Sequence, residues 1–337
     1  MTIGALALVV VAAAAISAGL IVALRPVLAR YALARPNARS SHVEPTPQGG
    51  GIAVLIAIVA VVGIAMFGLH VAQADAKWFA LLFGATTLIA IVGAADDILT
   101  LAVAPRLALQ ALAVAMMLAA LPADLRVAAA LPWWVERALM LVAGLWFVNL
   151  TNFMDGIDWM TVAEVVPIAA ALGIFGLAGV FPAQGVVVAA ALGGAILGFA
   201  PFNRPVARLF LGDVGSVPIG LLLAWLLVLL AGEGHLAAAL LLPFYYGSDA
   251  TITLARRLRN RERLWEAHRS HFYQRATAGG FTVGEVVARV FAVNVVLALM
   301  AFATVRYDTA LVGVVALAGA VAMVGLLLRS FARGRER

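Results

Sequence analysis

The sequence contains no cysteine, and only 12% of its 337 residues are charged. The lack of cysteine excludes disulfide frameworks, zinc–thiolate centres and thiol catalysis. The scarcity of charge argues against a soluble domain, in which about 25% of residues are charged and about 45–50% are apolar. Here 64% are hydrophobic and the mean hydropathy is +1.05. The composition therefore predicts an all-α, polytopic integral membrane protein.

The chain has about eleven apolar stretches, each close to the ~20 residues that a helix needs to cross a bilayer. No internal repeat is evident, and no polar stretch is long enough to fold by itself. We therefore expect residues 1–337 to form a single transmembrane domain. The expected spans are 3–24, 51–69, 78–95, 106–122, 132–149, 160–180, 183–200, 215–231, 236–254, 284–304 and 308–328.

Positive charge predicts the orientation of these spans. The first apolar stretch is followed, not preceded, by Arg25, which favours an uncleaved helix with an outside N-terminus over a signal peptide. With that start, 19 of the 23 Lys and Arg residues fall in inside segments and four fall outside. This bias satisfies the positive-inside rule. It predicts a periplasmic N-terminus and a cytoplasmic C-terminus, and it explains the net charge of +6 without nucleic-acid binding.

Every polar cluster of chemical interest falls in a predicted inside loop. An even number of spans separates these loops, so they can meet on one membrane face. This asymmetry suggests a site at the inner membrane surface rather than a pathway across the membrane. The clusters are "RSSHVEPTPQGGG" (39–51), "GAADD" (93–97), "NLTNFMDGID" (149–158), "FNRPVARLFLGDVGS" (202–216) and "HRSHFYQR" (268–275). They occupy the loops at about 25–50, 95–106, 149–160, 201–215 and 255–283.

Adjacent carboxylates end the third predicted span, at Asp96 and Asp97. The two negative charges repel each other at a membrane interface unless a cation or a proton neutralises one of them. One interpretation is a phosphate-handling site supported by Mg²⁺ or by a basic side chain. The alternative is a solvated helix end.

The segment at 149–158 combines two carboxamides with two carboxylates. Asn149, Asn152 and Asp155 are spaced by three residues, so a helical continuation places them on one face. Their oxygens suit Mg²⁺, and the amides can hold a base or a sugar. Gly156 then interrupts the helix before Asp158. Helix capping and a turn are the alternative explanation, but capping accounts for only one or two such residues.

Two further loops offer groups for an anion. Asp213 lies between glycines just before a span, where it could ligate a metal while helix N-terminal amides favour phosphate. His268, Arg269 and His271 lie in an Arg-rich loop, where contact with a diphosphate is favoured over metal ligation. Binding to anionic lipid explains part of that positive charge. For the 39–51 segment, a plain turn and a substrate loop are nearly equal alternatives.

Taken in this order, the five clusters resemble the polyprenyl-phosphate N-acetylhexosamine-1-phosphate transferases of glycosyltransferase family 4. The resemblance extends from "RSSHVEPTPQGGG" to "HRSHFYQR". The last segment looks most like the branch that primes O-antigen or common-antigen synthesis. The resemblance implies an enzyme of the bacterial inner membrane that uses Mg²⁺, with Mn²⁺ as an alternative. The implied substrates are undecaprenyl phosphate and a UDP-N-acetylamino sugar, and the oligomeric state, including a homodimer, stays open.

The same resemblance implies roles for individual residues. Catalytic positions are Asp96, Asp97, Asp155, His268 and His271, and metal ligands are Asn152 and Asp213. Substrate-binding positions are Asn149, Gly156, Ile157, Asp158, Asn203, Phe210, Arg106 and Arg269.

Two departures from the family pattern concern substrate specificity. Trp159 stands where the family usually has glycine, and Pro205 comes one residue early after Asn203.

The expected reaction is attack of the lipid phosphate on the β-phosphorus of the UDP-sugar, with release of UMP. A two-step route through an Asp nucleophile stays open. A lipid or solute transporter is the alternative class, although no repeat and few mid-span charges support it. A scaffold anchored by the basic loops would not need the Asp and Asn clusters.

Overall fold

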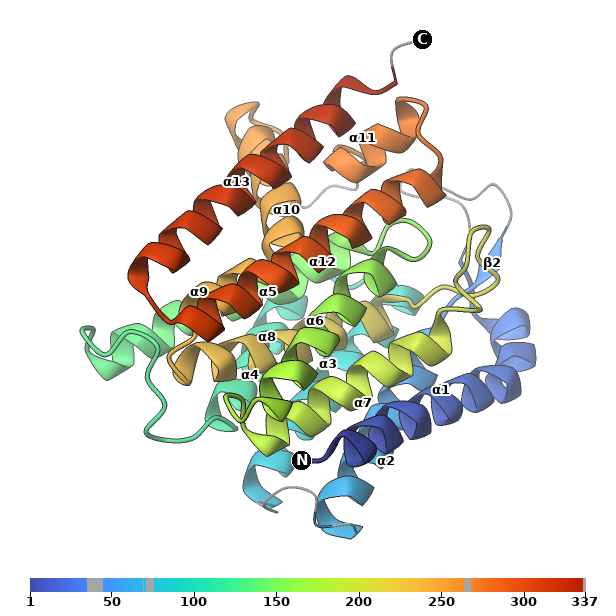
Figure 1. Ribbon diagram of the computed structural model, residues 1–337. Helices are drawn as coiled ribbons and strands as arrows, with labels where there is room; N and C mark the ends of the chain where they lie inside the picture. Colours follow the sequence, from blue (N-terminus) through green and yellow to red (C-terminus); the bar gives the residue numbers. More distant parts are fainter. Residues whose placement is uncertain (35–44, 69, 71–75, 264–267, 336–337) are drawn as a thin grey trace.

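The computed structural model describes residues 1–34, 45–68, 70, 76–263 and 268–335. The expected segment at 39–44 therefore lies outside the described residues. Within the described part, the chain is a bundle of long helices whose two termini lie at opposite ends (Figure 1). This arrangement confirms the all-α, polytopic prediction. The only strands described are a two-residue pair, β1 (Leu33–Ala34) and β2 (Thr46–Pro47).

In the described part of the chain, eight helices are long and apolar enough to cross a membrane. They are α1 (Ile3–Tyr31), α2 (Gly50–Gly63) with its π-helical extension η1 (Ile64–Gly68), α3 (Ala76–Leu99), α5 (Trp133–Met154), α6 (Met160–Leu177), α8 (Asp213–Gly232), α12 (Val283–Tyr307) and α13 (Ala310–Arg333). Two shorter apolar helices, α4 (Val103–Ala119) and α7 (Ala183–Phe199), fill further predicted spans. The chain is thus a multi-pass membrane protein.

The ninth predicted span, 236–254, is a broken helix rather than a continuous one. It consists of α9 (Leu236–Leu241) and α10 (Phe244–Arg259), with Pro243 between them. Proline lacks the backbone N–H that helix continuation needs, so the break falls where expected for this residue. The short helix α11 (Phe272–Ala278) follows and packs against α10, α12 and α13.

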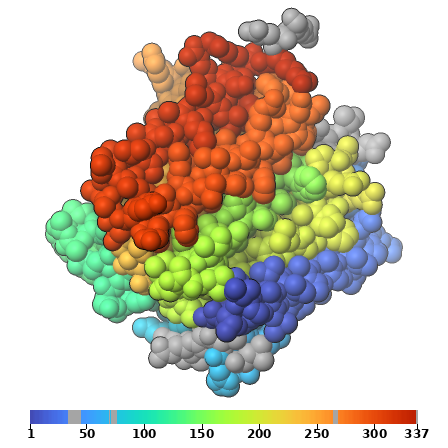
Figure 2. Space-filling view, viewed as in Figure 1, coloured from blue at the N-terminus to red at the C-terminus, as the bar shows by residue number. Residues whose placement is uncertain are grey.

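The centre of the bundle is α8, nearly all of whose residues are buried. It packs against α2, α3, α5 and α9. The outer face seen in Figure 2 runs from α13 and α12 across α6 and α7 to α1 on the opposite edge.

Small residues let the helices approach closely, since lipid provides no hydrophobic drive for helix association. On α7, a Cβ at Gly194 or Gly198 would overlap the backbone of α1 at Val10 or Ala14. Similarly, a Cβ at Gly51 of α2 would overlap Gly215 of α8. These contacts bring the ends of the helices together and thereby position the loops between them.

Candidate active site

The loops at one end of the bundle are held together by backbone hydrogen bonds. Phe210 N donates to Pro47 O at 2.8 Å, and Gly50 N donates to Phe210 O at 2.9 Å. Gly51 N then donates to Leu211 O at 2.9 Å. The described part of the 39–51 segment therefore lies against the segment before α8. Phe210 takes part through its backbone, and its side chain is half-buried.

The end of α3 meets the start of α8. Gly93 makes this contact possible, because a Cβ there would overlap the backbone of Asp213. Val214 N donates to Asp97 Oδ2 at 3.3 Å. The free amides and the macrodipole of a helix N-terminus stabilise a carboxylate at this place. Asp97 and Asp213 consequently lie on the same end of the bundle.

The two carboxylates of the Asp pair have different partners. Asp96 forms an ion pair with Arg106 and accepts a hydrogen bond from Leu101 N at 2.7 Å. Asp97 turns instead toward α8. The repulsion that the sequence implies is therefore relieved on one side by a cation and on the other by helix amides. Asp96, Asp97 and Arg106 all lie close enough to Asp213 to act on it electrostatically.

The carboxamides of α5 join it to two neighbouring helices. Asn152 Nδ2 donates to Asp213 Oδ2 at 3.2 Å, and Asn152 Oδ1 accepts from Ser216 Oγ at 2.8 Å. Asn149 Nδ2 donates to Gln110 Oε1 of α4 at 2.9 Å. Of these two amides, only Asn152 contacts the α8 N-terminus directly.

Asp155 lies just beyond the last residue of α5, at its C-cap. Loss of solvation raises the pKa of this carboxyl to about 7, and the nearby Asp213 and Asp97 charges add to the rise. A hydrogen bond from Thr161 Oγ1 acts in the opposite direction. Crowding of several carboxylates at one point is costly without a cation, so this corner of the site has the electrostatic character of a cation site.

The turn after α5 is locked by the 200–211 loop. Ile157 and Asp158 are buried, and Asp158 Oδ2 accepts from Ala207 N at 3.0 Å. Asn203 uses both ends of its amide within the protein: Oδ1 accepts from Trp159 N at 2.8 Å, and Nδ2 donates to Leu209 O at 3.0 Å. Its expected contact with a nucleotide stays a prediction.

Trp159, the departure from the family pattern, has a structural role in this turn. It adopts a left-handed conformation, with φ of 63°, at the N-cap of α6. Its indole Nε1 donates to Ala200 O at 2.7 Å. The indole ring is thus held against the end of α7.

The His-containing loop packs against the end of α5. The ring of His271 stacks on those of His268 and Tyr273, with centroid distances of 5.0 Å and 5.8 Å. The Phe153 ring lies 6.2 Å from it. Tyr273 Oη donates to Phe153 O at 2.9 Å, and a Cβ on Gly156 would overlap this hydroxyl. Arg269 is exposed at the edge of the loop.

Asp249, which the sequence analysis did not single out, holds this loop in place. Its buried carboxylate accepts from Phe272 N at 2.9 Å and from Tyr273 N at 3.1 Å, at the start of α11. Tyr245 Oη also donates to it, at 3.2 Å, and His271 Nδ1 lies 3.4 Å from Oδ1. The available signal was an acidic residue inside a predicted span, which is rare unless it has a structural or functional partner.

The carboxylate and amide oxygens around Asp213 suit Mg²⁺, with some coordination positions left for a substrate. Among the described residues, no three acidic or histidine side chains form a ready-made metal cluster. Asp213 and Asn152 lie in direct contact, and Asp97 and Asp155 are close to Asp213. Mg²⁺ is commonly held by one or two carboxylates together with substrate phosphates and water. The oxygen-rich corner around Asp213 fits that description.

Comparisons with known proteins agree with this arrangement. The family model described as Glycosyl transferase family 4 matches residues 78–231, which hold the Asp pair, the 149–158 segment and Asp213. The decaprenyl-phosphate N-acetylglucosaminephosphotransferase of Mycobacterium tuberculosis is 28% identical, covering 88% of this chain and 83% of its own length. The corresponding protein of Mycobacterium leprae is 27% identical, covering 88% and 82%.

A shorter match reaches another member of this group of proteins. The phospho-N-acetylmuramoyl-pentapeptide-transferase of Acinetobacter baylyi is 26% identical over 47% of this chain and 46% of its own length. Residues 78–231 match glycosyl transferase family 4, and most of the chain is similar to the two mycobacterial phosphotransferases.

Proposed function

We propose that this protein transfers an N-acetylamino-sugar 1-phosphate from a UDP-sugar to a polyprenyl phosphate. The names of its relatives support this class of reaction, since they act on decaprenyl phosphate or transfer a phospho-sugar. Undecaprenyl phosphate is the specific acceptor in this proposal. The product, undecaprenyl-diphospho-sugar, would start an O-antigen or a related cell-envelope polysaccharide at the inner membrane.

The observation that carries the proposal is the meeting of three helices at the N-terminus of α8. There Asp213 contacts Asn152 of α5, and Asp97 of α3 accepts from Val214 N. Phosphoryl transfer depends mainly on positioning and on neutralising crowded negative charge. A helix N-terminus surrounded by oxygen ligands, with Arg106 and the His268–His271 loop nearby, offers these two properties.

The proposed chemistry is a single displacement at phosphorus. An oxygen of the lipid phosphate forms a bond to the β-phosphorus of the UDP-sugar, and the bond from that phosphorus to the UMP oxygen breaks. The sugar keeps its bond to the transferred phosphorus. Asp97 accepts the proton of the lipid phosphate, whose second pKa is about 6.

The remaining predicted residues bind the donor in this proposal. His268, His271 and Arg269 support the diphosphate, and the 156–158 turn faces the uridine. Asn152 and Asp213 would hold Mg²⁺, or Mn²⁺ in its place. When bound, the metal would neutralise charge on the diphosphate.

The test is a reaction of the purified protein with undecaprenyl phosphate, Mg²⁺ and a panel of UDP-N-acetylamino sugars. UMP release that depends on the lipid and stops with a chelator supports the proposal, and the most active donor identifies the sugar. A transporter would release no UMP with any donor. UMP released once per enzyme without the acceptor lipid would indicate the two-step route instead.

A further inference from the structure

A buried polar contact joins α6 to α12 within the membrane-spanning part of the bundle. Glu164 of α6 and Asn294 of α12 are both buried. Asn294 Nδ2 donates to Glu164 Oε2 at 2.7 Å, and it is the only hydrogen-bond partner of this carboxyl group among the described residues. A carboxyl group inside a membrane span is costly, so its presence points to a function.

The same amide also satisfies a backbone carbonyl that a proline leaves free. Pro167 lies inside α6, and it has no N–H to donate to the carbonyl of Ala163, four residues earlier. Asn294 Nδ2 donates to Ala163 O at 2.9 Å instead. In lipid, a freed backbone carbonyl must find its partner within the protein. One side chain of α12 therefore holds α6 at two adjoining points, the backbone of Ala163 and the side chain of Glu164.

The part of α6 that Asn294 holds also carries a contact to the candidate active site. Thr161 lies three residues before Glu164, so the two side chains share a face of the helix. Thr161 is buried, and its Oγ1 donates to the Asp155 carboxylate. Asp155 is in turn close enough to Asp213 for the two charges to act on each other. A rotation or slip of α6 would thus move Thr161 and displace the Asp155 carboxylate.

Tyr246 of α10 extends this contact to a third helix. Its buried hydroxyl interacts electrostatically with Glu164 and Asp155 and lies close to the Thr161 hydroxyl. Polar groups of α6, α10 and α12 therefore form one buried cluster that reaches Asp155. Because lipid provides no hydrophobic drive for helix association, such polar contacts have a large part in setting the register of these helices.

We propose that Glu164 and Asn294 are positioning residues, which hold the first turns of α6 so that Thr161 keeps the Asp155 carboxylate beside the proposed Mg²⁺ site. Neither residue touches a substrate or the metal. The inference rests on the proposed function for its effect on UMP release, but binding of Mg²⁺ can be measured without substrates. A contact that only stabilised helix packing would lower the unfolding temperature and leave Mg²⁺ binding unchanged.

The test measures the Mg²⁺ concentration that half-maximally raises the unfolding temperature of the purified full-length protein. Asn294→Leu and Glu164→Leu should each raise this concentration about tenfold, a usual loss when a residue that supports a metal site is removed. The kcat of UMP release should fall by the same factor, with an unchanged KM for the lipid. Glu164→Gln should keep the parental values, because its amide oxygen can still accept from Asn294.

Pro167→Ala separates positioning from stability. In Asn294→Leu the carbonyl of Ala163 loses its donor, and adding Pro167→Ala supplies a backbone N–H in its place. The double variant should therefore recover unfolding temperature but not Mg²⁺ binding, since the link to Glu164 is still absent. Recovery of both together would show that the contact only satisfies the backbone, and would overturn the proposal.

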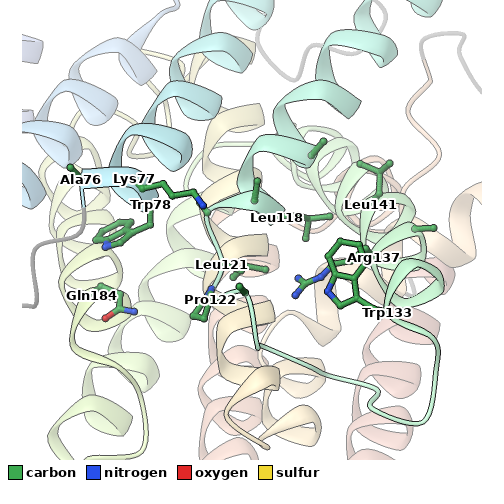
Figure 3. Close-up of a pocket in the computed structure, with 15 residues that line it drawn as sticks. Ala76, Lys77, Trp78, Leu118, Leu121, Pro122, Trp133, Arg137, Leu141 and Gln184 are labelled. Atoms are coloured by element: carbon green, nitrogen blue, oxygen red, sulfur yellow. The ribbon is translucent and has the colours of Figure 1, made fainter.

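Gln184→Leu is the matched control, because it removes an amide at the opposite end of the bundle. Gln184 lies near the start of α7, where it lines a groove together with Trp78 and Pro122 (Figure 3). This variant should bind Mg²⁺ and release UMP like the parent protein. A loss equal to that of Asn294→Leu would show that the effect is not specific to the α6–α12 contact.

Failure of the proposed function can be told apart from failure of the positioning role. A parent protein that binds Mg²⁺ but releases no UMP with any donor would contradict the function, and the Mg²⁺ comparison would still test the positioning role. Should Asn294→Leu fail to fold, Glu164→Leu decides alone. Unchanged Mg²⁺ binding in the Leu variants, equal losses in Glu164→Gln and Glu164→Leu, or a parent protein that Mg²⁺ does not stabilise would each overturn the proposal.

Discussion

Two neighbouring aspartates of identical chemistry have different surroundings in this protein. Asp96 is neutralised by Arg106, whereas Asp97 contacts the backbone at the start of α8. A carboxylate already paired with a guanidinium is a poor proton acceptor, because the pair stabilises its charged form. The 3.3 Å contact of Asp97 with Val214 N stabilises its charged form less than the Arg106 ion pair stabilises that of Asp96, because charge-assisted bonds are the stronger. The geometry therefore favours Asp97 for the proton transfer of the proposed reaction.

Replacing Asp97 by Asn should lower UMP release by about 100-fold or more, the usual range for loss of a general base. The neutral amide keeps the size of the side chain but cannot take the proton. The measurement is initial-rate UMP release at matched membrane abundance. Asp124→Asn, at an exposed position of the opposite end, serves as the control and should behave like the parent. Near-parental activity of Asp97→Asn would show that the proton goes elsewhere.

The sequence predicted which polar residues gather at one end of the bundle, but not their contacts. Asp96, Asp97, Asn152, Asp155 and Asp213 stand out because polar residues are scarce in this chain, and the structure groups them at one end. Their individual partners depend on packing between distant segments, which a local pattern does not contain. For the same reason, their catalytic roles stay predictions.

The role of Asp249 could not be predicted from the residues around it in the sequence. It lies in a predicted span, and its partners Phe272 and Tyr273 are more than twenty residues away. Nothing in "YYGSDATIT" indicates that it caps a later helix. Only the fold brings the two segments together.

At the scale of elements, the first two backbone N–H groups of α11 both donate to one carboxylate of α10, that of Asp249. Asp249→Asn should misplace α11, because an amide offers only one acceptor oxygen where two backbone N–H groups now donate. We expect about a tenfold loss of UMP release and a lower unfolding temperature, given about 1 kcal/mol per hydrogen bond.

Thr253→Val is the matched control for Asp249→Asn. It removes a 3.3 Å hydrogen bond to the same carboxylate and leaves both backbone contacts of α11 in place. Faster proteolysis of the α10–α12 connection in Asp249→Asn, but not in Thr253→Val, would show that α11 has come loose. Equal behaviour of the two variants would contradict the positioning role.

The crossing of α2 and α8 depends on the absence of a side chain. Gly51→Ala should separate these helices, since its Cβ would overlap the Gly215 backbone, and overpacking costs about 1–3 kcal/mol. The expected result is a lower unfolding temperature together with reduced UMP release. Gly63→Ala in the same helix is the control, because the nearest atom to its Cβ would be a Phe79 ring carbon at an ordinary 3.7 Å. A parental melting temperature for Gly51→Ala would argue against a tight crossing.

At the scale of the whole molecule, hydropathy predicted the succession of spans, because long apolar runs follow directly from bilayer thickness. The structure differs from the hydropathy prediction in where individual helices break and end. The break at Pro243 and the extension of α10 to Arg259 place basic residues on a helix where a loop was expected. Composition alone does not fix such boundaries, since neighbouring helices decide them.

The predicted orientation can be tested directly because the chain has no cysteine. Single cysteines at the exposed positions Arg208 and Asp124, at opposite ends of the bundle, give a clean readout with a membrane-impermeant thiol reagent. Asp124→Cys should react in intact cells with a permeabilised outer membrane. Arg208→Cys should react only after the inner membrane is opened. The reverse pattern would place the candidate site outside the cytoplasm.

The enclosed position of α8 sets a constraint on how turnover can proceed. Asp213 begins a helix that packs against α2, α3, α4, α5, α7 and α9 and is buried over nearly its whole length, so we expect this aspartate to keep one height relative to the bilayer. In the proposed reaction, substrates must then reach that height and products must leave it. The long isoprenoid tail of the proposed acceptor would then keep that lipid in the bilayer and bring its phosphate to the depth of Asp213.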